Sequence, residues 1–569
     1  MKKHAGNVMA DLLVGYGVEA VFGLPGGQTL PLYYGIMDNA PKIKHILMRD
    51  ENNAVFAADA YARVARKLGV CDGTAGCGPI KFLSGFAEAM NSSSPVLGIA
   101  AEMAYDELSS RYRGGGAQLI DAQAILKPVT KWTARLPKAN SVAELTQFAA
   151  RMAISGRPGP VYIECPWDLF DDEYAGPDYE ADPHLAQIPS YRSLPPQEDM
   201  EKALEVLKSA KNPVILAGGG AWFSDAKEEL TTLAEALAIP VGTSLSGKGI
   251  VDENHPLSIG VASGLGGGDY AKQMVMNADV IFAAGYKFSE MSTYKWTLPK
   301  AGQRIIHVDI DSAELGKLSA VEIGMNGDVK ATVGRMLELL GDVQPKEIPE
   351  AILQGKKKAM EERAAEIENK TPIMPQQVVS LLNEICDENT ILACDASFSC
   401  GWAAKYFDVY GGRRALMPRG MSGLGYGLPA GIGAAVARPK DKVVVLTGDG
   451  GLSYCLGELQ TLNEQNMDVK VIVLNNKTLG WIKWYQAGIW DGRFSEVDTL
   501  ENDFAMIARG SGIEGYRLEN PKTLAEELKK IIAADGPALV DIITSETEAC
   551  KFTDDPKAVS YVEKDHQNK

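Results

Sequence analysis

Apolar and polar residues alternate along this chain in two rhythms. Short runs rich in β-branched residues, such as VVVLT (443–447) and VKVIVL (469–474), are separated by longer stretches in which apolar positions follow helical spacing. Buried parallel strands connected by helices produce this alternation, so the expected fold class is α/β.

Two polar stretches divide the chain into three blocks. Segment 172–198 is rich in Asp, Glu, Pro and Tyr, and segment 344–371 includes the charged run KKKAMEERAAEIENK. Such composition is typical of solvated linkers. We therefore predict three doubly wound parallel-sheet domains, at 1–175, 190–343 and 372–550, followed by a tail or lid at 551–569.

Composition and charge limit the classes of function. The net charge of −17 and the lack of a basic block make nucleic acid or an anionic membrane an improbable partner. No apolar run approaches the length of about 18 residues that predicts a transmembrane helix, and the first residues lack the apolar core of a signal peptide. The eight scattered cysteines form no CxxC pair and the six histidines form no HExxH motif, so we expect a cytoplasmic protein and no zinc hydrolase.

The most informative stretch joins two strand ends. The run VVVLT leads into Gly448-Asp449-Gly450, and VKVIVL leads into Asn475-Asn476. In a parallel sheet the carboxyl ends of neighbouring strands open on one crevice, so Asp449 and Asn476 are expected to face one ion. Hard oxygen ligands of this kind suit Mg²⁺, and the small residues after Asp449 allow backbone N–H groups to approach a phosphate.

This arrangement resembles the thiamine diphosphate (ThDP) signature of the superfamily of acetolactate synthases, benzaldehyde lyases and 2-oxo acid decarboxylases. The segments 155–168 (SGRPGPVYIECPWD), 307–317 (HVDIDSAELGK) and 423–435 (GLGYGLPAGIGAA) extend the resemblance over nearly the whole chain. It implies a pyrimidine-binding domain, a central nucleotide-fold domain and a diphosphate-binding domain, in that order. It also implies a homodimer or homotetramer with active sites at subunit interfaces.

The resemblance assigns cofactor and metal residues by position. The metal ligands would be Asp449, Asn476 and the backbone carbonyl of Thr478. Leu424 would wedge between the two rings of ThDP, while the backbone near Gly420 and Ser422 would contact the aminopyrimidine. The other residues expected to contact the cofactor are Gly26, Gly27, Ala396, Ser397, Phe398, Gly448, Gly450, Gly451, Leu479 and Gly480.

The catalytic carboxylate is expected at Glu51. It stands between the strand-like run 43–48 and the helical run AVFAADAYARVA, where the helix dipole alone would also favour Glu. The resemblance places it on the glutamate that activates the cofactor, a role that benefits from an apolar pocket and a raised pKa. Asp50, where the family often has His, would either help to raise that pKa or only cap the helix.

The expected substrate pocket combines amides with bulky side chains. By position it holds Gln28 and Gln118, which would act with Glu51 as catalytic residues, and Trp481, Ile482 and Tyr485. Acetolactate synthases carry an Arg in a run that reads GYKFSEM here, so Met291 removes a clamp for a second 2-oxo acid. Runs such as PVTKW, CPWDL and DSAELGKL look closer to benzaldehyde lyase-like enzymes.

The function expected is that of a ThDP- and Mg²⁺-dependent lyase or carboligase. It would act through a C2-bound enamine on small 2-oxo acids, acyloins or aldehydes. A simple 2-oxo acid decarboxylase, or a non-catalytic ThDP-binding paralogue, is the alternative. The GGGAW turn (218–222) and Asp309 fit a nucleotide fold, but the spacing G-x-G-x-x-G is absent, so FAD is doubtful and an NAD(P) enzyme is disfavoured.

Overall fold

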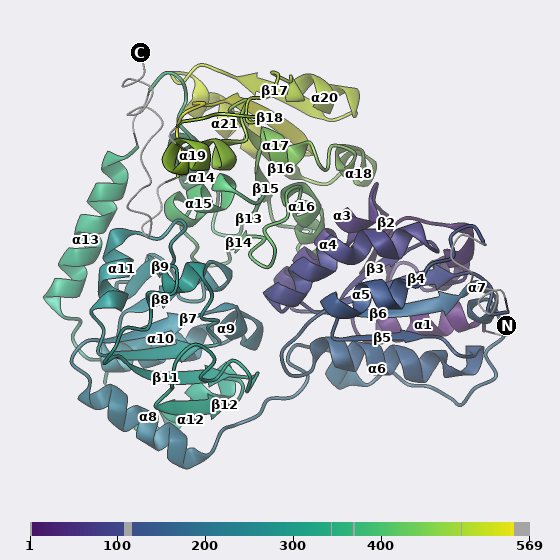
Figure 1. Ribbon diagram of the computed structural model, residues 1–569, viewed down its shortest axis with the longest axis horizontal. Coiled ribbons are helices and arrows are strands. Elements are labelled where there is room, and N and C mark those ends of the chain that lie inside the picture. The colour runs from purple at the N-terminus through teal and green to yellow at the C-terminus, as the bar shows by residue number, and fades with distance from the viewer. Residues whose placement is uncertain (1–2, 107–115, 343, 368–369, 491, 551–569) are drawn as a thin grey trace. The chain divides into compact units, whose positions relative to one another are not determined.

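The computed structural model describes residues 3–106, 116–342, 344–367, 370–490 and 492–550 (Figure 1). Three six-stranded sheets organise these residues, and helices separate the strands along the chain. The chain divides into two compact units. The first unit is Met1–Tyr191 with Pro418–Asp441 and Tyr454–Val469, and the second is Arg192–Met417 with Lys442–Ser453 and Lys470–Lys569.

The first unit contains the first sheet, in the order β2-β1-β3-β4-β6-β5, with all strands parallel. Its strands are β1 (Ala20–Gly23), β2 (Lys44–Leu47), β3 (Gly69–Gly73), β4 (Val96–Glu102), β5 (Trp132–Arg135) and β6 (Val161–Pro166). Its helices are α1 (Ala5–Gly15), η1 (Gly27–Thr29), α2 (Leu30–Asp38), α3 (Glu51–Ala65), α4 (Cys77–Ser92), α5 (Ala122–Leu126), η3 (Lys127–Val129), η4 (Ala139–Ser141), α6 (Val142–Ile154), α7 (Trp167–Phe170), η5 (Pro183–Ala186), α16 (Gly427–Ala437) and α18 (Glu458–Gln465).

The second unit opens with the second sheet, in the order β12-β11-β10-β7-β8-β9. Its strands are β7 (Pro213–Ala217), β8 (Val241–Thr243), β9 (Ser258–Val261), β10 (Val280–Ala284), β11 (Arg304–Asp309) and β12 (Ile323–Asn326). The accompanying helices are α8 (Gln197–Ser209), α9 (Gly219–Ser224), α10 (Lys227–Leu237), η6 (Leu245–Gly247), α11 (Asp269–Met276), η7 (Met291–Thr293), α12 (Val329–Leu340) and α13 (Glu350–Ala365). The order, with its reversal between β7 and β10, is that of a nucleotide-binding fold.

The third sheet has the order β14-β13-β15-β16-β18-β17. Its strands are β13 (Ile391–Cys394), β14 (Arg414–Leu416), β15 (Val443–Gly448), β16 (Val469–Asn475), β17 (Glu514–Leu518) and β18 (Ala538–Ile543). Its helices in the second unit are α14 (Pro375–Ile385), α15 (Phe398–Tyr406), α17 (Asp449–Leu452), α19 (Gly480–Ile489), α20 (Phe504–Gly510) and α21 (Leu524–Ala533). The two apolar runs of the sequence analysis are therefore the neighbouring strands β15 and β16.

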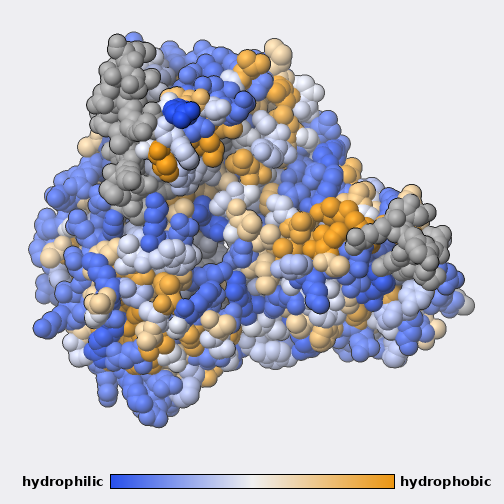
Figure 2. Space-filling view, viewed as in Figure 1, coloured by the Kyte–Doolittle hydropathy of each residue, from blue (hydrophilic) through white to orange (hydrophobic). Residues whose placement is uncertain are grey.

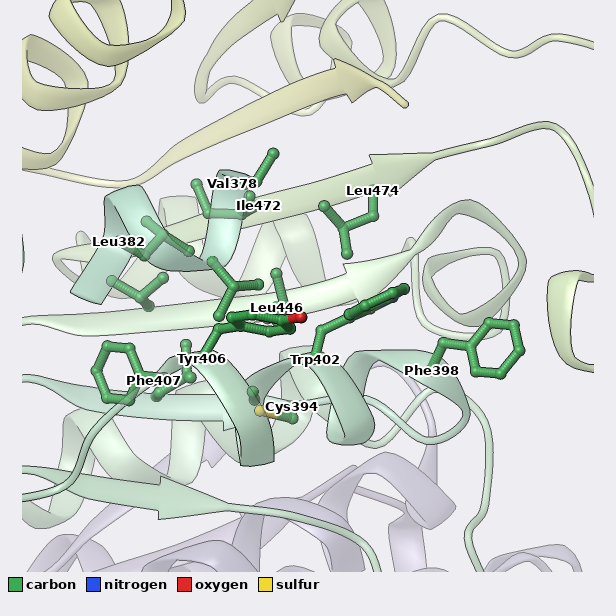
Figure 3. Packing of buried hydrophobic residues seen from close by; sticks show 14 of the residues in the cluster. Val378, Leu382, Cys394, Phe398, Trp402, Tyr406, Phe407, Leu446, Ile472 and Leu474 are labelled. Carbon is green, nitrogen blue, oxygen red and sulfur yellow. The ribbon is translucent and has the colours of Figure 1, made fainter. Parts of the chain in front are cut away.

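Helix α15 packs on strands β15 and β16 of the third sheet. Leu446 and Ile472, from β15 and β16, belong to a buried cluster with Trp402 and Tyr406 of α15 (Figure 3). Figure 3 shows Phe398 beyond Trp402, on the side toward which the strands point. The start of α15 therefore lies toward the ends of β15 and β16, which are followed by Asp449 and Asn476.

In the first unit, small residues let α16 lie against α3. A Cβ atom on Gly433 would stand 2.1 Å from the carbonyl oxygen of Ala57, so only glycine permits this approach. Phe56 and Tyr426 pack edge to face beside it, with ring centroids 5.2 Å apart. The chain segment just before α16 is thus held on α3.

These observations confirm the α/β class with three parallel sheets. The charged segment 344–371 contains α13, none of whose residues is buried, as expected of a solvated linker helix. The predicted tail or lid at 551–569 lies outside the described residues. Among those that are described, no helix has both the length and the apolar character needed to cross a membrane. None of the eight cysteines, all of which lie among the described residues, forms a disulfide, and only Cys77 is exposed.

Candidate active site

The strand ends of the third sheet bring the two predicted metal-binding turns together. Asp449 is the first residue of α17, directly after β15, and is 7% exposed. Backbone N–H groups of Gly450, Asn476 and Lys477 face its carboxylate and lower its pKa, but burial outweighs them and raises the pKa to about 6. The turn after β15 and the turn after β16 therefore meet at one buried carboxylate, as the sequence predicts.

The turn after β16 has a fixed shape. Asn475 points into the sheet, where its amide donates to Asp541 at 2.9 Å, whereas Asn476 Oδ1 accepts the N–H of Thr478 at 3.2 Å. Lys477 adopts a positive φ of 54°, and Leu479 donates its N–H to Val497 at 2.8 Å. Of the two asparagines, Asn476 is the one beside the Asp449 carboxylate.

The turn before α15 completes this edge and contains a residue that the sequence analysis missed. Asp395 is 1% exposed, and its carboxylate accepts the N–H of Ala396 at 2.7 Å and the hydroxyl of Thr447 at 3.2 Å. A Cβ on Gly451 would stand 2.9 Å from Asp395 Cγ. Asp395 thus holds the 396–398 turn against the glycines after Asp449; its position at a strand end was the only sequence signal.

Ser397 shows strain in the same turn. Its φ of 71° and ψ of −146° lie in a region that glycine normally occupies. Such strain occurs where the surrounding structure fixes the backbone for a functional purpose. It is consistent with the predicted contact of Ala396, Ser397 and Phe398 with a diphosphate.

The donor set at this edge fits a hard cation with phosphate. Among the described residues no group of three or more His, Cys, Asp or Glu side chains could hold a metal ion. Asp449 and Asn476 offer oxygen atoms, and an ion with few protein ligands takes the rest from phosphate and water. A Cβ on Gly450 would meet only Leu479 Cδ2, at 3.2 Å, so the backbone there is open to a close ligand. The residues present therefore fit Mg²⁺ and a diphosphate.

Glu51 stands where the sequence predicts it, as the first residue of α3, and is 5% exposed. Its Oε2 lies 3.1 Å from Lys81 Nζ but makes no well-aligned hydrogen bond. Asp50 caps α3 by accepting the N–H of Asn52 at 2.8 Å, and its hydrogen bond raises the pKa of Lys81. Asp50 therefore caps the helix, and the buried Oε2 of Glu51 faces the Lys81 ammonium.

Gln28 and Gln118 meet at the carboxyl edge of the first sheet. Gln28 Nε2 donates to Gln118 Oε1 at 3.1 Å, and Thr74 donates its hydroxyl to Gln28 Oε1 at 3.1 Å. Gln118 has a positive φ of 65° and touches Gly76, where a Cβ would stand 2.6 Å from its carbonyl oxygen. Gly78 follows Gly76 by two residues, and a Cβ on Gly78 would stand 3.7 Å from Glu51 Oε1. The start of α4, at residues 76–78, thus links the amide pair to the carboxylate.

The remaining first-unit candidates lie on exposed turns. A Cβ on Gly26 would collide with Thr74 Oγ1 at 1.9 Å, whereas Gly27 has nothing within 4 Å. Leu424 is 39% exposed, which suits a side chain that packs on a ligand, and Ser422 before it has a φ of 54°.

The predicted pocket wall is an aromatic cluster. Trp481 packs on Phe398 with ring centroids 5.3 Å apart and on Tyr485 at 6.2 Å. Ile482 is 48% exposed, and Met291 packs against the same buried cluster from η7. A Cβ on Gly480 would stand 3.1 Å from Asn476 Nδ2, so this aromatic cluster begins beside the turn that contains Asn476.

The predicted residues fall on both units. Glu51, Gln28, Gln118, Gly26, Gly27, Ser422 and Leu424 lie in the first unit; Ala396, Ser397, Phe398, Gly448, Asp449, Gly450, Gly451, Asn476, Thr478, Leu479, Gly480, Trp481, Ile482 and Tyr485 lie in the second. Within each unit they gather at a carboxyl edge or on the loops beside it.

Comparison with known families agrees with this geometry. Three family models match: thiamine pyrophosphate enzyme, N-terminal TPP binding domain (3–125), central domain (200–336) and C-terminal TPP binding domain (395–542). The chain belongs to the thiamine pyrophosphate enzymes and is a ThDP-dependent enzyme.

Curated relatives narrow the comparison within that family. The chain is 35% identical to a probable acetolactate synthase large subunit of Methanocaldococcus jannaschii, over 94% of this chain and 90% of that one. It is 33% identical to the acetolactate synthase large subunit of Lactococcus lactis subsp. lactis, over 94% and 91%. For the large subunit of Cyanidium caldarium the identity is 32%, over 95% and 93%. These similarities favour the acetolactate synthase side of the resemblance, which Met291 had weakened in the sequence analysis.

Proposed function

We propose that this enzyme is a Mg²⁺- and ThDP-dependent carboligase that joins small 2-oxo acids or aldehydes. The single observation that carries the proposal is the meeting of two strand-end turns at the buried carboxylate of Asp449. Similarity to acetolactate synthases supports a ligation reaction over simple decarboxylation and over a non-catalytic binder.

Asp449, Asn476 and the carbonyl of Thr478 would hold Mg²⁺, which would bind the diphosphate together with the turns at Gly450 and Ser397. When bound, ThDP supplies a carbon acid and an electron sink for making and breaking carbon–carbon bonds. The protein contributes fixed oxygen ligands, close backbone approach at glycine and exclusion of water by the aromatic wall.

Glu51 would exchange a proton with the aminopyrimidine nitrogen of bound ThDP. Gln28 and Gln118, joined by a hydrogen bond of 3.1 Å, would orient the substrate carbonyl. Because the amide of Gln28 is itself held by Thr74, the donor direction of this pair is defined before a substrate binds. The first sheet would thus supply the proton and the carbonyl contact.

The test replaces Glu51 by Gln and follows hydrogen–deuterium exchange at C2 of bound ThDP by acid quench and NMR. Lys81 retains Asp50 at 2.9 Å, so the variant is expected to fold and to bind ThDP. Exchange should slow by about 10² to 10⁴-fold, the usual contribution of general acid–base catalysis. The matched control is Asp50→Asn, which keeps a good helix cap. Wild-type exchange rates in Glu51→Gln would refute the role.

The uncharged side chain of Met291 bears on the choice of acceptor substrate. Met291 offers a thioether where acetolactate synthases, by the resemblance, carry Arg, and it packs with the cluster that contains Phe398 and Trp481. Met291 itself brings no cation that could bind a second carboxylate. We therefore favour an aldehyde or another uncharged carbonyl compound as acceptor. A panel with pyruvate as donor should give more product with an aldehyde than with 2-oxobutyrate; the opposite order would reject this preference.

FAD is not part of the proposal. In the second sheet Gly218 donates its N–H to Ala284 at 3.0 Å, and Gly220 donates to Gly285 at 3.0 Å. A Cβ on Gly218 would stand 2.2 Å from the Gly285 carbonyl oxygen, so the turn is packed against its neighbour and the N–H groups of Gly218 and Gly220 are occupied. Purified protein should show no flavin absorbance near 450 nm after mixing with FAD and gel filtration.

A homodimer or homotetramer remains the expected assembly. Ile80 and Leu83 of α4 are each 40% exposed, and Figure 2 shows apolar surface over this helix. Exposed apolar side chains on the helix that begins beside Glu51 suit an interface at the active site. Light scattering on the eluted protein should give a multiple of the chain mass of 61.1 kDa.

A further inference from the structure

A buried glutamate of the first unit is hydrogen-bonded to a loop far away in the sequence. Glu88 lies near the end of α4 and is fully buried. Its carboxylate accepts the backbone N–H groups of Gly420 at 2.8 Å, Met421 at 2.6 Å and Ser422 at 3.2 Å. Three consecutive amides thus surround one carboxylate, which is an arrangement that proteins otherwise use for bound anions.

The same carboxylate is anchored from the other side. Arg63 Nη2 lies 3.2 Å away and Ser92 donates its hydroxyl at 2.8 Å. Arg63 also pairs with Asp59, at 2.9 Å, and Asp59 accepts the hydroxyl of Tyr426 at 2.8 Å. The position of Glu88 is therefore defined by side chains of α3 and α4 as well as by the loop.

Close packing on α4 and an unusual backbone conformation accompany these hydrogen bonds in the loop. A Cβ on Gly420 would stand 2.3 Å from the backbone carbonyl oxygen of Glu88, so the loop touches α4 directly. Ser422 has a φ of 54°, a backbone conformation that L-residues adopt only when it is stabilised. A charged acceptor for three consecutive amides supplies that stabilisation.

The contacts also decide which groups the loop offers to a ligand. The three N–H groups are occupied by Glu88, and the carbonyl of Gly420 accepts from Asn91 at 3.3 Å. Among the described residues, none donates a hydrogen bond to the carbonyl oxygens of Met421 and Ser422, so these acceptors are the backbone groups that the loop offers to a ligand. An exocyclic amino group is a donor and fits such a surface.

We propose that Glu88 is a positioning residue that shapes the 420–422 loop so that its carbonyl oxygens bind the amino group of the ThDP pyrimidine. This inference rests on the proposed function, because it takes from it that the loop contacts the aminopyrimidine. Glu88 itself touches neither cofactor nor substrate. Its effect should therefore appear in binding of the pyrimidine and not in binding of the diphosphate.

The test compares Glu88→Gln with Glu164→Gln in the full-length protein. Glu164 is another buried glutamate of the first unit, paired with Arg135 at 2.5 Å, and makes no hydrogen bond to the 420–422 loop. Calorimetry would measure binding of ThDP with Mg²⁺ and, separately, of inorganic pyrophosphate with Mg²⁺. Hydrogen exchange by mass spectrometry would follow the amides of the peptide that contains 420–422.

Glu88→Gln should weaken ThDP binding by at least about tenfold, because hydrogen bonds to a charged acceptor are lost. Pyrophosphate binding should stay within twofold of wild type, and exchange of the loop amides should become faster. Glu164→Gln should change none of these. A folded Glu88→Gln protein with wild-type ThDP affinity, or equal losses for ThDP and pyrophosphate, overturns the proposal.

Two further outcomes are decisive. If Glu88→Gln does not fold, Glu88→Asp keeps the charge on a shorter side chain, and unchanged ThDP affinity in that variant also overturns the proposal. If the wild-type protein binds no ThDP, the proposed function fails by itself. The loop amides then decide the role of Glu88: faster exchange only in Glu88→Gln supports its hold on the loop, and unchanged exchange refutes it.

Discussion

Replacing Gly451 by Ala tests whether the close contact of two turns is what builds the diphosphate site. An alanine Cβ would stand 2.9, 3.0 and 3.1 Å from Cγ, Oδ2 and Oδ1 of Asp395. Ordinary contacts of this kind begin near 3.4 Å, so the carboxylate must move by several tenths of an ångström. Asp395 is 1% exposed and bonded to Ala396 at 2.7 Å, and it has little room to move.

The expected cost follows from this geometry. Overpacking a tight site costs about 1 to 3 kcal/mol, and a displaced Asp395 also weakens its hydrogen bond to Ala396. Gly451→Ala should therefore lower the melting temperature of the cofactor-free protein and weaken binding of ThDP with Mg²⁺ by about 10 to 100-fold. Calorimetry measures both quantities on the same sample.

Two other glycines provide the comparison. At Gly450 a Cβ would meet only Leu479 Cδ2, the end of a flexible side chain, at 3.2 Å. Gly450→Ala should keep the melting temperature and lose affinity only through obstruction of the phosphate. Gly510, with nothing within 4 Å, controls for the general effect of Gly→Ala. If Gly451→Ala melts and binds like Gly510→Ala, the contact between the turns does not determine the site.

Two further changes act on the same edge of the third sheet. The pKa of Asp449 is raised by burial to about 6 from the value of 3.8 in an unfolded chain, so the stability that protonated Asp449 confers is complete below pH 3.8 and is lost as the pH rises through 6. Without cofactor at pH 7.5, the free energy of unfolding of Asp449→Asn should therefore exceed that of the wild type by up to about 3 kcal/mol, and the variant should melt at a higher temperature. With Mg²⁺ and ThDP it should melt at a lower temperature than the wild type; the same order in both conditions would contradict a metal ligand. Ser397→Gly should relieve the strain of its φ of 71° and raise stability by about 1 kcal/mol, whereas Ser397→Ala should not; equal melting of both variants would show that the backbone there is unstrained.

Much of the site could be predicted because it depends on rules local to the sequence. A carboxylate and a carboxamide at the ends of Val443–Gly448 and Val469–Asn475 must share an edge when those strands are parallel neighbours. Glu51 begins α3, where a strand-like run gives way to a helical one. The pairing of Asp449 with Asn476 needed no knowledge of distant contacts. The catalytic role of Glu51 came from the family resemblance, because the helix dipole alone also favours Glu at that position. The role of Asp50 stayed open because capping and charge repulsion place the same residue type at the same position, and only the bond to Asn52 separates them.

Asp395 and Glu88 could not be predicted in this way, because their partners lie far along the chain. Glu88 is 332 residues from Gly420, and Asp395 is 52 residues from Thr447. A buried glutamate within a helix has no sequence signature that separates an acceptor for amides from an ion-pair partner. Lys81 is similar, since its pairing with Asp50 and Glu51 arises only when α3 and α4 lie together.

The two missed carboxylates have one physical feature in common. Asp395 and Glu88 are both almost fully buried, and each accepts backbone N–H hydrogen bonds from a loop assigned to the cofactor. A glycine lies close to each of them: a Cβ on Gly451 would collide with Asp395, and a Cβ on Gly420 would collide with Glu88. Neither Gly451 nor Gly420 has a positive φ, so these glycines are required for close approach and not for backbone freedom. A buried carboxylate that binds amides fixes a loop more strongly than a neutral acceptor does, and it leaves the carbonyl oxygens and the opposite face of the loop for a ligand. Each unit therefore holds one of these loops with a buried charge, and we expect the cost of neutralising either charge to appear in cofactor binding before it appears in the fold.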